Sequence, residues 1–206
     1  MKSKLQNPTK NREKTENKLL AAAAEVFSTR GYDGCNVRQI AEDAGVNVSL
    51  INRYFGGKEG LFEAVIGQLI DQKQNADLGY PPQETLREEI FEYLKFRLRV
   101  DIKNDQLNRI LISRVATDHV FRDKVMDMLM TGADQNMLAR LERLKLVGQI
   151  PPDEDIEQVF TAISHFSFSA NFLGHAIMVR SRRATLVDFD AFARTYSNGI
   201  SQKSGE

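Results

Sequence analysis

The sequence predicts an all-α protein with a three-helix amino-terminal domain, a larger helical second domain and about nine helices in total. Apolar residues recur at helical spacing along almost the whole chain of 206 residues, and no clear run alternates with a period of two. Glycine or proline ends most of the periodic segments. Apolar residues make up 42% and charged residues 27%, which is ordinary for a globular protein. The chain is long enough for one large or two small domains with a sizeable buried core.

Composition shifts divide the chain into three parts. Residues 1–14 are polar and basic and are predicted to form a flexible arm. The amino-terminal domain is predicted over residues 15–77, and the second domain over residues 83–203. A Gly-Tyr-Pro-Pro break at 79–82 separates the two domains.

Start and stop signals delimit the helices of the first domain. A helix over about 15–29 has one apolar face and ends at Gly31. The next is predicted to begin after Asn36 as its N-cap, with Gln39 completing a variant of the capping box, and to end at Gly45. Asn47 is the expected N-cap of a short helix over 48–54, and a longer helix begins near residue 58.

The second domain is predicted to hold five helices, because its apolar stripes are long and its break signals few. Pro151-Pro152 followed by three acidic residues is a strong start signal, since carboxylates favour the positive end of a helix. The predicted helices cover about 83–100, 106–117, 120–146, 156–179 and 185–200.

Residues 37–61 form the most specific pattern in the chain. Two helices too short to be stable alone are joined by the turn Ala44-Gly45-Val46-Asn47. This is the arrangement of a helix-turn-helix, here at about 37–56, which places its second helix in the major groove of DNA. The pattern predicts that double-stranded DNA is a partner of this chain.

Polar side chains at fixed places in this motif are the candidate DNA contacts. Short side chains at the front of the second helix let it settle deeply in the groove, where Ser49 and Asn52 can bond to base edges and Val48 can touch a thymine methyl. A phosphate is favoured where Lys58 opens the next helix. The full candidate set is Asn36, Arg38, Asn47, Val48, Ser49, Asn52, Tyr54 and Lys58.

Simpler interpretations remain open for several of these residues. Arg38 and Arg53 are also consistent with solvated surface charges, and Tyr54 with a half-buried packing residue. Lys58 is also consistent with a partner in a nearby carboxylate. The basic residues of the arm are consistent with a solubilising tail.

Residues of about 12–65 resemble the DNA-binding domain of the tetracycline-repressor (TetR) family of bacterial transcription regulators. The resemblance rests on Ala22–Phe27 with Gly31-Tyr32, Val37–Ala41, Ala44-Gly45-Val46, Tyr54-Phe55 and Lys58–Leu61. Two positions depart from the family pattern. Asn47 stands where the family usually has serine or threonine, and Asn52 stands where it usually has an aromatic residue. The operator sequence therefore cannot be copied from relatives.

The helix predicted over 156–179 carries two apolar faces, which indicates burial on both sides. One face can meet the core of its own domain, so the other is predicted to meet a second copy of the chain in a four-helix bundle. The resemblance also implies such homodimers. The alternative is that Phe168 and Phe172 pack on other helices of the same chain. The candidate interface residues are His165, Phe168, Phe172, Ala176, Phe189, Phe192 and Tyr196.

A small-molecule effector is a further expected partner, because helical bundles often enclose ligand pockets and the resemblance implies an inducer or corepressor. The sequence does not identify the pocket. Ordinary core packing is the commoner role for each of the candidate lining residues, which are Phe91, Phe96, Met126, Met130, Phe160 and Phe166.

Composition excludes several other classes. Cys35 is the only cysteine, so neither an internal disulfide nor a cysteine-based zinc site is possible, and a cytoplasmic location is expected. Residues 158–179 lack charges but carry too many polar side chains for a membrane span. No cofactor, metal site or catalytic set is expected, so the chain is predicted not to be an enzyme.

The distribution of charge fits the DNA-binding hypothesis. The net charge is zero, but residues 1–60 hold ten basic and seven acidic residues, while the remainder holds 18 and 21. A mildly basic head suits contact with phosphate. The prediction is a ligand-responsive homodimeric repressor on a near-palindromic operator. The alternatives are a helical small-molecule-binding protein or enzyme whose helix-turn-helix is only a packing unit, and an architectural DNA-bound protein without an effector.

Overall fold

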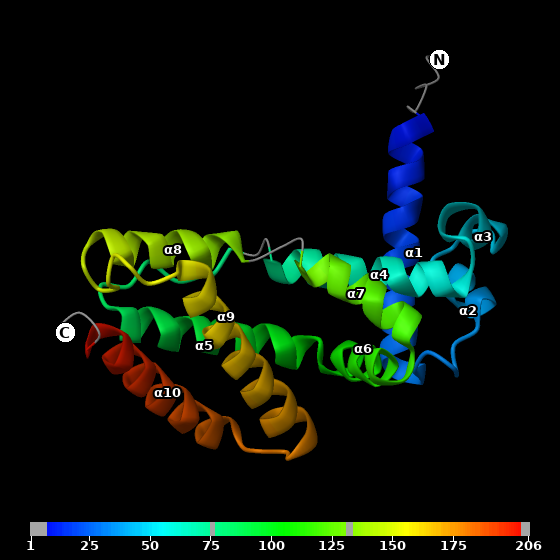
Figure 1. Ribbon diagram of the computed structural model, residues 1–206. Helices are drawn as coiled ribbons and strands as arrows, with labels where there is room; N and C mark the ends of the chain where they lie inside the picture. The colour runs from blue at the N-terminus through cyan, green and yellow to red at the C-terminus, as the bar shows by residue number, and fades with distance from the viewer. Residues whose placement is uncertain (1–7, 75–76, 131–133, 203–206) are drawn as a thin grey trace. The chain divides into compact units, whose positions relative to one another are not determined.

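The computed structural model describes residues 8–74, 77–130 and 134–202, and these residues form two compact units. The first unit comprises residues up to Asp71 together with Gln106–Met128, and the second comprises Gln72–Asp105 with the remainder of the chain from Leu129. Ten α-helices and one π-helical segment account for the regular structure of the described residues, labelled in Figure 1. The all-α prediction is confirmed.

The first unit contains six helices around one hydrophobic core. Phe27, Ile40, Ile51 and Phe62 are completely buried, and Phe121 from later in the chain is 2% exposed in the same core. The six helices are α1 (Pro8–Arg30), α2 (Val37–Asp43), α3 (Ser49–Phe55), α4 (Lys58–Gln74), α6 (Asp105–Thr117) and α7 (His119–Met130).

Helices α6 and α7 belong to the first unit, whereas the sequence analysis assigned them to the second domain. The sequence pattern predicts a second domain running without interruption over 83–203, yet the contacts group Gln106–Met128 with the amino-terminal helices. The physical reason is that Leu107, Phe121 and Val125 bury their side chains in the first core. Periodicity identifies such apolar stripes but does not identify the core that receives them.

Helix α1 begins earlier than predicted, at Pro8 instead of about residue 15. Proline suits the first turn of a helix, where its missing N–H has no partner to lose. An ion pair one turn apart, with 2.8 Å between Arg12 Nε and Glu16 Oε1, supports the exposed first turns. Half of the predicted arm is therefore helical, and residues 1–7 lie outside the described part of the chain.

The second unit is a bundle of four α-helices and a π-helical segment. Helix α10 packs along α5, and α9 packs against α5 and α8 (Figure 1). Its core includes the fully buried residues Tyr93, Leu141, Ile163 and Phe189. The elements are α5 (Leu86–Lys103), α8 (Gln135–Leu146), α9 (Ile156–Phe168), η1 (Ser169–Ile177) and α10 (Arg182–Gln202).

The single helix predicted over 120–146 is wrong, because two helices, α7 and α8, occupy this stretch. Asp134 is the N-cap of α8, with its side chain accepting a hydrogen bond of 3.1 Å from the backbone N–H of Met137. At its other end, Gly148 with a φ of 80° ends α8 as predicted, and the N–H of Gln149 bonds back to the carbonyl of Leu144.

The helix predicted over 156–179 changes type along its length. Asp155 caps α9 by accepting hydrogen bonds from the N–H groups of Glu157 and Gln158, as the acidic start signal predicts. After Phe168 the chain continues as the π-helix η1, a form often found at functional sites. Val179 follows it with a φ of 51°, an unusual value for a β-branched residue.

Among the described residues, none of the helices has the combination of length and hydropathy that crossing a bilayer requires.

Candidate nucleic-acid interface

Helices α2 and α3 form a helix-turn-helix whose inner face is buried in the first core. Ile40 and Ala41 of α2 and Ile51 of α3 are buried in the first core. Between them Gly45 adopts a φ of 65°, a conformation that favours glycine, and the N–H of Val46 bonds to the carbonyl of Ala41 at 2.9 Å. This packing fixes the orientation of α3 and leaves its opposite face outward.

The outward face of α3 presents the predicted base-reading side chains. Val48, Ser49 and Asn52 are all exposed, and Val48 keeps 38% of its surface accessible despite being apolar. The structure thus places the three predicted readers on one accessible surface. Arg38 at the start of α2 is exposed as well.

The two candidate asparagines before these helices also have a structural role. Asn36 Oδ1 accepts a hydrogen bond from the N–H of Arg38 at 2.9 Å, and Asn47 Oδ1 accepts one from the N–H of Ser49 at 2.8 Å. Asn36 is the N-cap of α2, as predicted. The N-cap position of α3 is Val48, one residue later than predicted, although Asn47 still bonds to the first N–H of the helix. The predicted capping box is wrong in its second half, because the amide of Gln39 donates to Asp43 and not back toward Asn36.

Tyr54 and Lys58 are each held by a cation–aromatic contact. The guanidinium of Arg12 lies 5.2 Å from the ring centre of Tyr54. Lys58 Nζ lies 4.5 Å from the ring centre of Tyr32 and 3.5 Å from the carbonyl oxygen of Asp33. The sequence analysis kept a nearby carboxylate as an alternative partner of Lys58. Within residues 8–74, the contacts of Lys58 are instead with an aromatic ring and a backbone carbonyl.

Arg114 of α6 joins this surface to the core, and sequence reasoning did not single it out. Its guanidinium lies 4.2 Å from the ring centre of Tyr32, 4.6 Å from that of Phe121 and 5.4 Å from that of Phe62. Its Nη2 also donates to Glu59 Oε1 at 2.9 Å. The one nearby residue in the sequence that could have indicated a structural role for Arg114 is Asp118, one helical turn later. Arg114 Nη2 donates a second hydrogen bond, of 2.9 Å, to Asp118 Oδ2.

The charges around Arg114 shift the ionisation of its neighbours. Burial, followed by the hydrogen bond to Glu59, raises the pKa of the Tyr32 hydroxyl to about 12. Burial alone would raise the pKa of the Glu59 carboxyl, but hydrogen bonds from Tyr32 and Arg114 lower it overall. Glu59 therefore contributes stability above the ordinary pKa of a glutamate, and this contribution is lost as the pH falls through its lowered pKa.

Replacing Arg114 with alanine is expected to lower the free energy of unfolding by about 2 kcal/mol, because a cation among three rings and two charge-assisted hydrogen bonds are lost together. Urea denaturation of the whole chain measures the change. Arg122→Ala is the matched control on α7, where an exposed ion pair with Asp123 is expected to contribute less than about 1 kcal/mol. Equal effects of the two variants would contradict a structural role for Arg114.

The two predicted apolar faces of α9 differ in burial within the second unit. Val159, Ile163 and Ser167 are buried, whereas His165 and Phe168 are exposed, with Phe168 at 55%. The rings of Phe168 and half-buried Phe172 stack at 5.6 Å between their centres. The side chain of Ala176 lies outside the described residues.

The predicted interface stripe on α10 needs one correction. Phe189 is completely buried inside its own chain, so it belongs to the core and cannot contact a partner. Phe192 is half-buried and stacks on Phe166, with 3.9 Å between ring centres, and on Tyr196 at 5.2 Å. These two residues remain candidates, because part of each ring stays accessible.

The six candidate pocket residues do not form one group. Phe91, Phe96, Phe160 and Phe166 belong to the second core, whereas Met126 is exposed in the first unit. The side chain of Met130 lies outside the described residues.

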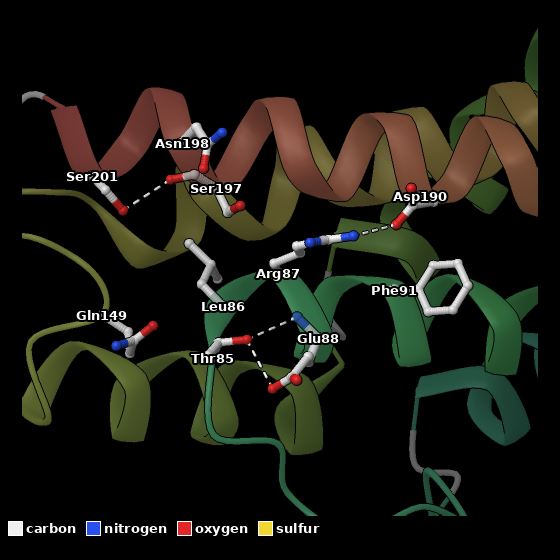
Figure 2. Close-up of a pocket in the computed structure, with 10 residues that line it drawn as sticks. All are labelled: Thr85, Leu86, Arg87, Glu88, Phe91, Gln149, Asp190, Ser197, Asn198 and Ser201. Atoms are coloured by element: carbon white, nitrogen blue, oxygen red, sulfur yellow. Dashed lines mark hydrogen bonds and ion pairs between the residues drawn. The ribbon is translucent and has the colours of Figure 1, made fainter.

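The second unit has an open, mostly polar pocket of about 570 Å³ between the start of α5 and the end of α10. Figure 2 shows the ion pair across it, with 2.8 Å between Arg87 Nη2 and Asp190 Oδ1. Phe91 is the one predicted lining residue found here. The others are Thr85, Leu86, Glu88, Gln149, Ser197, Asn198 and Ser201.

Comparison with known proteins supports a regulatory role for this fold. The family model described as "Bacterial regulatory proteins, tetR family" matches residues 19–65. The HTH-type transcriptional regulator RutR of Escherichia coli K12 is 28% identical over 189 residues, which cover 87% of this chain and 84% of RutR. The HTH-type transcriptional repressor AcnR of Corynebacterium glutamicum is 29% identical over 156 residues, covering 75% and 76%.

Solved structures show the same fold. Salmonella enterica GusR superposes with a TM-score of 0.66 at 21% identity, covering 97% of this chain and 100% of GusR. A TetR-family transcriptional regulator from Rhodococcus sp. superposes with a TM-score of 0.70 at 16% identity, covering 92% and 99%.

Proposed function

With residues 19–65 this chain belongs to the TetR family of bacterial regulatory proteins and is a DNA-binding transcriptional regulator, and from this premise we propose that it is a homodimeric, ligand-responsive repressor acting in the cytoplasm. The observation that carries the DNA-binding site is the exposed row of Val48, Ser49 and Asn52 on a helix locked by buried Ile51. A rigid helix with short polar side chains outward is what major-groove reading requires.

The proposed contacts divide into two classes. Ser49, Asn52 and Val48 read base edges, whereas Tyr54 and Lys58 contact the phosphate backbone with help from Arg38. The side-chain oxygens of Asn36 and Asn47 each accept a backbone hydrogen bond from the residue two positions on, so their amide N–H groups are the atoms they offer to DNA. Two such heads on half-sites about one helical turn apart imply a near-palindromic operator.

The proposal of repression and ligand response rests on different support. AcnR is named a transcriptional repressor, which favours the same sign of regulation here. The second unit has a core of its own and is joined to the first by three chain crossings, after Asp71, Asp105 and Met128. A ligand that binds one state of this unit better shifts the population between DNA-competent and DNA-incompetent dimers.

Alanine at Asn52 or Ser49 is expected to change sequence preference and to cost about 1–3 kcal/mol of discrimination at the base it reads. Binding is measured on an operator selected from random duplexes and on unrelated DNA, each over a series of salt concentrations. Asn198→Ala, an exposed asparagine of the second unit, is the matched control. Equal losses on both DNAs for Asn52→Ala would remove it from the base readers.

Lys58→Gln is expected to weaken binding to every duplex by a similar factor and to reduce the salt slope by about one, because one phosphate contact is lost. Tyr54→Phe is expected to weaken binding to all DNA sequences by a similar factor, because it removes the hydroxyl but keeps the ring that Arg12 contacts. The same salt series measures both variants. An unchanged salt slope in Lys58→Gln would contradict the phosphate contact, and failure of the wild-type protein to retain any palindromic duplex would favour a packing role for the motif.

A further inference from the structure

Two cations lie against the same aromatic ring at the start of α4. Lys58 Nζ lies 4.5 Å from the ring centre of Tyr32, and the guanidinium of Arg114 lies 4.2 Å from it. The ring is itself fixed in the first core, because its centre lies 5.0 Å from that of fully buried Phe62 and 5.9 Å from that of Phe27. Tyr32 is therefore a rigid support shared by a residue of α4 and a residue of α6.

Glu59, the neighbour of Lys58 in the chain, is held at both carboxylate oxygens. Arg114 Nη2 donates to Oε1 at 2.9 Å, and the Tyr32 hydroxyl donates to Oε2 at 2.5 Å. The hydroxyl keeps its proton at neutral pH, since burial raises the pKa of Tyr32 to about 12. Arg114 thus acts on the first turn of α4 by two routes, one through the carboxylate and one through the ring.

The guanidinium of Arg114 is too enclosed to contact DNA itself. Its side chain is 17% exposed, its Nη1 is buried, and its Nη2 also donates to Asp118 at 2.9 Å. The rings of Phe62 and Phe121 lie 5.4 and 4.6 Å from it. A largely buried cation with two carboxylate partners is a fixed point, because breaking either bond would leave part of its charge uncompensated.

Lys58 keeps hydrogen-bonding capacity for a phosphate. An ammonium group has three donors, and one of them is directed to the carbonyl of Asp33, 3.5 Å away. A free carboxylate at Glu59 would compete, because it would repel a phosphate and attract the ammonium. Arg114 and Tyr32 pair with that carboxylate instead. Arg114 therefore supports the ring on which Lys58 rests and neutralises the competing charge.

We propose that Arg114 is a positioning residue for DNA binding, which holds Lys58 and the first turn of α4 in place to meet a phosphate without touching DNA. This role rests on the proposed phosphate contact of Lys58. Arg114 lies outside residues 19–65, which the family model matches. A residue from a later part of the chain thus completes the DNA-binding surface.

A double-mutant cycle tests this role. Arg114→Met keeps a long unbranched side chain against the rings and removes the bonds to Glu59 and Asp118, while Lys58→Gln removes the ammonium. The two single variants and the double variant of the full-length protein are titrated with the selected operator over a series of salt concentrations, at a temperature where urea denaturation shows each of them folded. Arg122→Met removes an exposed arginine of α7 in the same unit and is the matched control.

Arg114→Met is expected to weaken operator binding about 10-fold and to reduce the salt slope by the same amount as Lys58→Gln, because both lose the same phosphate contact. In the Lys58→Gln background it is expected to have no further effect on affinity, since the effects of residues that act through one contact do not add. Arg122→Met is expected to bind as the wild type does. A purely structural role would lower the urea midpoint and leave the salt slope unchanged.

Tyr32→Phe is a milder second variant, because it keeps the ring in the core and removes only the bond to Glu59. It is expected to weaken binding about threefold, again without further effect in the Lys58→Gln background. The proposal is overturned if Arg114→Met and Tyr32→Phe leave DNA affinity unchanged, if their effects add to that of Lys58→Gln, or if Arg122→Met loses as much affinity as Arg114→Met.

The same cycle separates this proposal from the proposed function. If Lys58→Gln weakens binding and the effect of Arg114→Met adds to it, the phosphate contact of Lys58 stands and the positioning role of Arg114 is rejected. If Lys58→Gln leaves both affinity and salt slope unchanged, the phosphate contact is wrong and the role of Arg114 is rejected with it.

Discussion

Replacing Gly60 with alanine is expected to destabilise the first unit by about 2 kcal/mol and to abolish specific DNA binding, although alanine is the better helix former by about 1 kcal/mol. A Cβ at this position in the first turn of α4 would lie 1.9 Å from the carbonyl oxygen of Phe55 and 3.0 Å from its carbon. Both atoms belong to the backbone at the end of α3, so no rotamer change relieves the clash. The reading helix itself must shift.

Gly67→Ala on the same helix is the control for this prediction. A Cβ there would meet only the sulfur of Met128, at an ordinary 3.9 Å, so the better propensity of alanine is expected to stabilise the protein by about 0.5–1 kcal/mol. Urea denaturation and operator binding measure both variants. Equal stability of Gly60→Ala and Gly67→Ala, with intact operator binding, would show that the junction between α3 and α4 tolerates the added methyl.

The helix-turn-helix was predictable from sequence because its signals are local. Asn36 caps α2 and Asn47 precedes α3, each through a hydrogen bond to the N–H two residues on, and Gly45 and Gly56 end the helices with positive φ angles. Cap and turn chemistry of this kind needs no knowledge of distant residues. The exposure of Ser49 and Asn52 follows directly, once Ile51 is assigned to the core.

Other features were not predictable because they depend on contacts between distant segments. Arg114 meets Tyr32 and Glu59 across 82 and 55 positions of the chain, and no periodicity reports such a pairing. The electrostatic interaction of Arg97 on α5 with Asp134, 37 positions later at the start of α8, was missed for the same reason. The local sequence around Arg114 or Arg97 is equally consistent with a solvent-exposed side chain.

The interface prediction shows the same limit within one pair of helices. Two apolar stripes on α9 were recognised from spacing, and the structure places Val159 and Ile163 in the core while Phe168 stays exposed. On α10 the stripe alone did not reveal that Phe189 is the residue turned inward. Amphipathic spacing predicts that one face of a helix is apolar, but only the packing of the folded chain shows which element covers that face.

An apolar surface at the end of the second unit supports the proposed dimer. Several large apolar side chains remain exposed from the end of α9 through η1 to α10, and exposed apolar patches often mark protein interfaces. The exposed residues are Phe168 at 55%, Leu173 at 48%, Met178 at 68%, Val179 at 80% and Val187 at 64%.

Phe168→Glu is expected to convert the proposed dimer into a monomer, because it replaces one of these exposed apolar side chains with a charge that a partner would have to desolvate. Loss of the second head is expected to weaken binding to a two-half-site operator by about 100-fold or more, since linked binding commonly adds that factor. Sedimentation measures the oligomeric state, and titration of full-site and half-site duplexes measures the affinity.

Leu146→Glu provides the matched change outside this surface, at the carboxyl end of α8, where the leucine is 85% exposed. If exposure alone made an apolar side chain part of the interface, both variants would dissociate. If the interface is the α9–η1–α10 surface, only Phe168→Glu dissociates, and its affinity for a half-site duplex stays that of the wild type because α3 is unchanged. A Phe168→Glu variant that remains dimeric would place the interface elsewhere, and the assignment of His165, Phe172, Phe192 and Tyr196 would be lost with it.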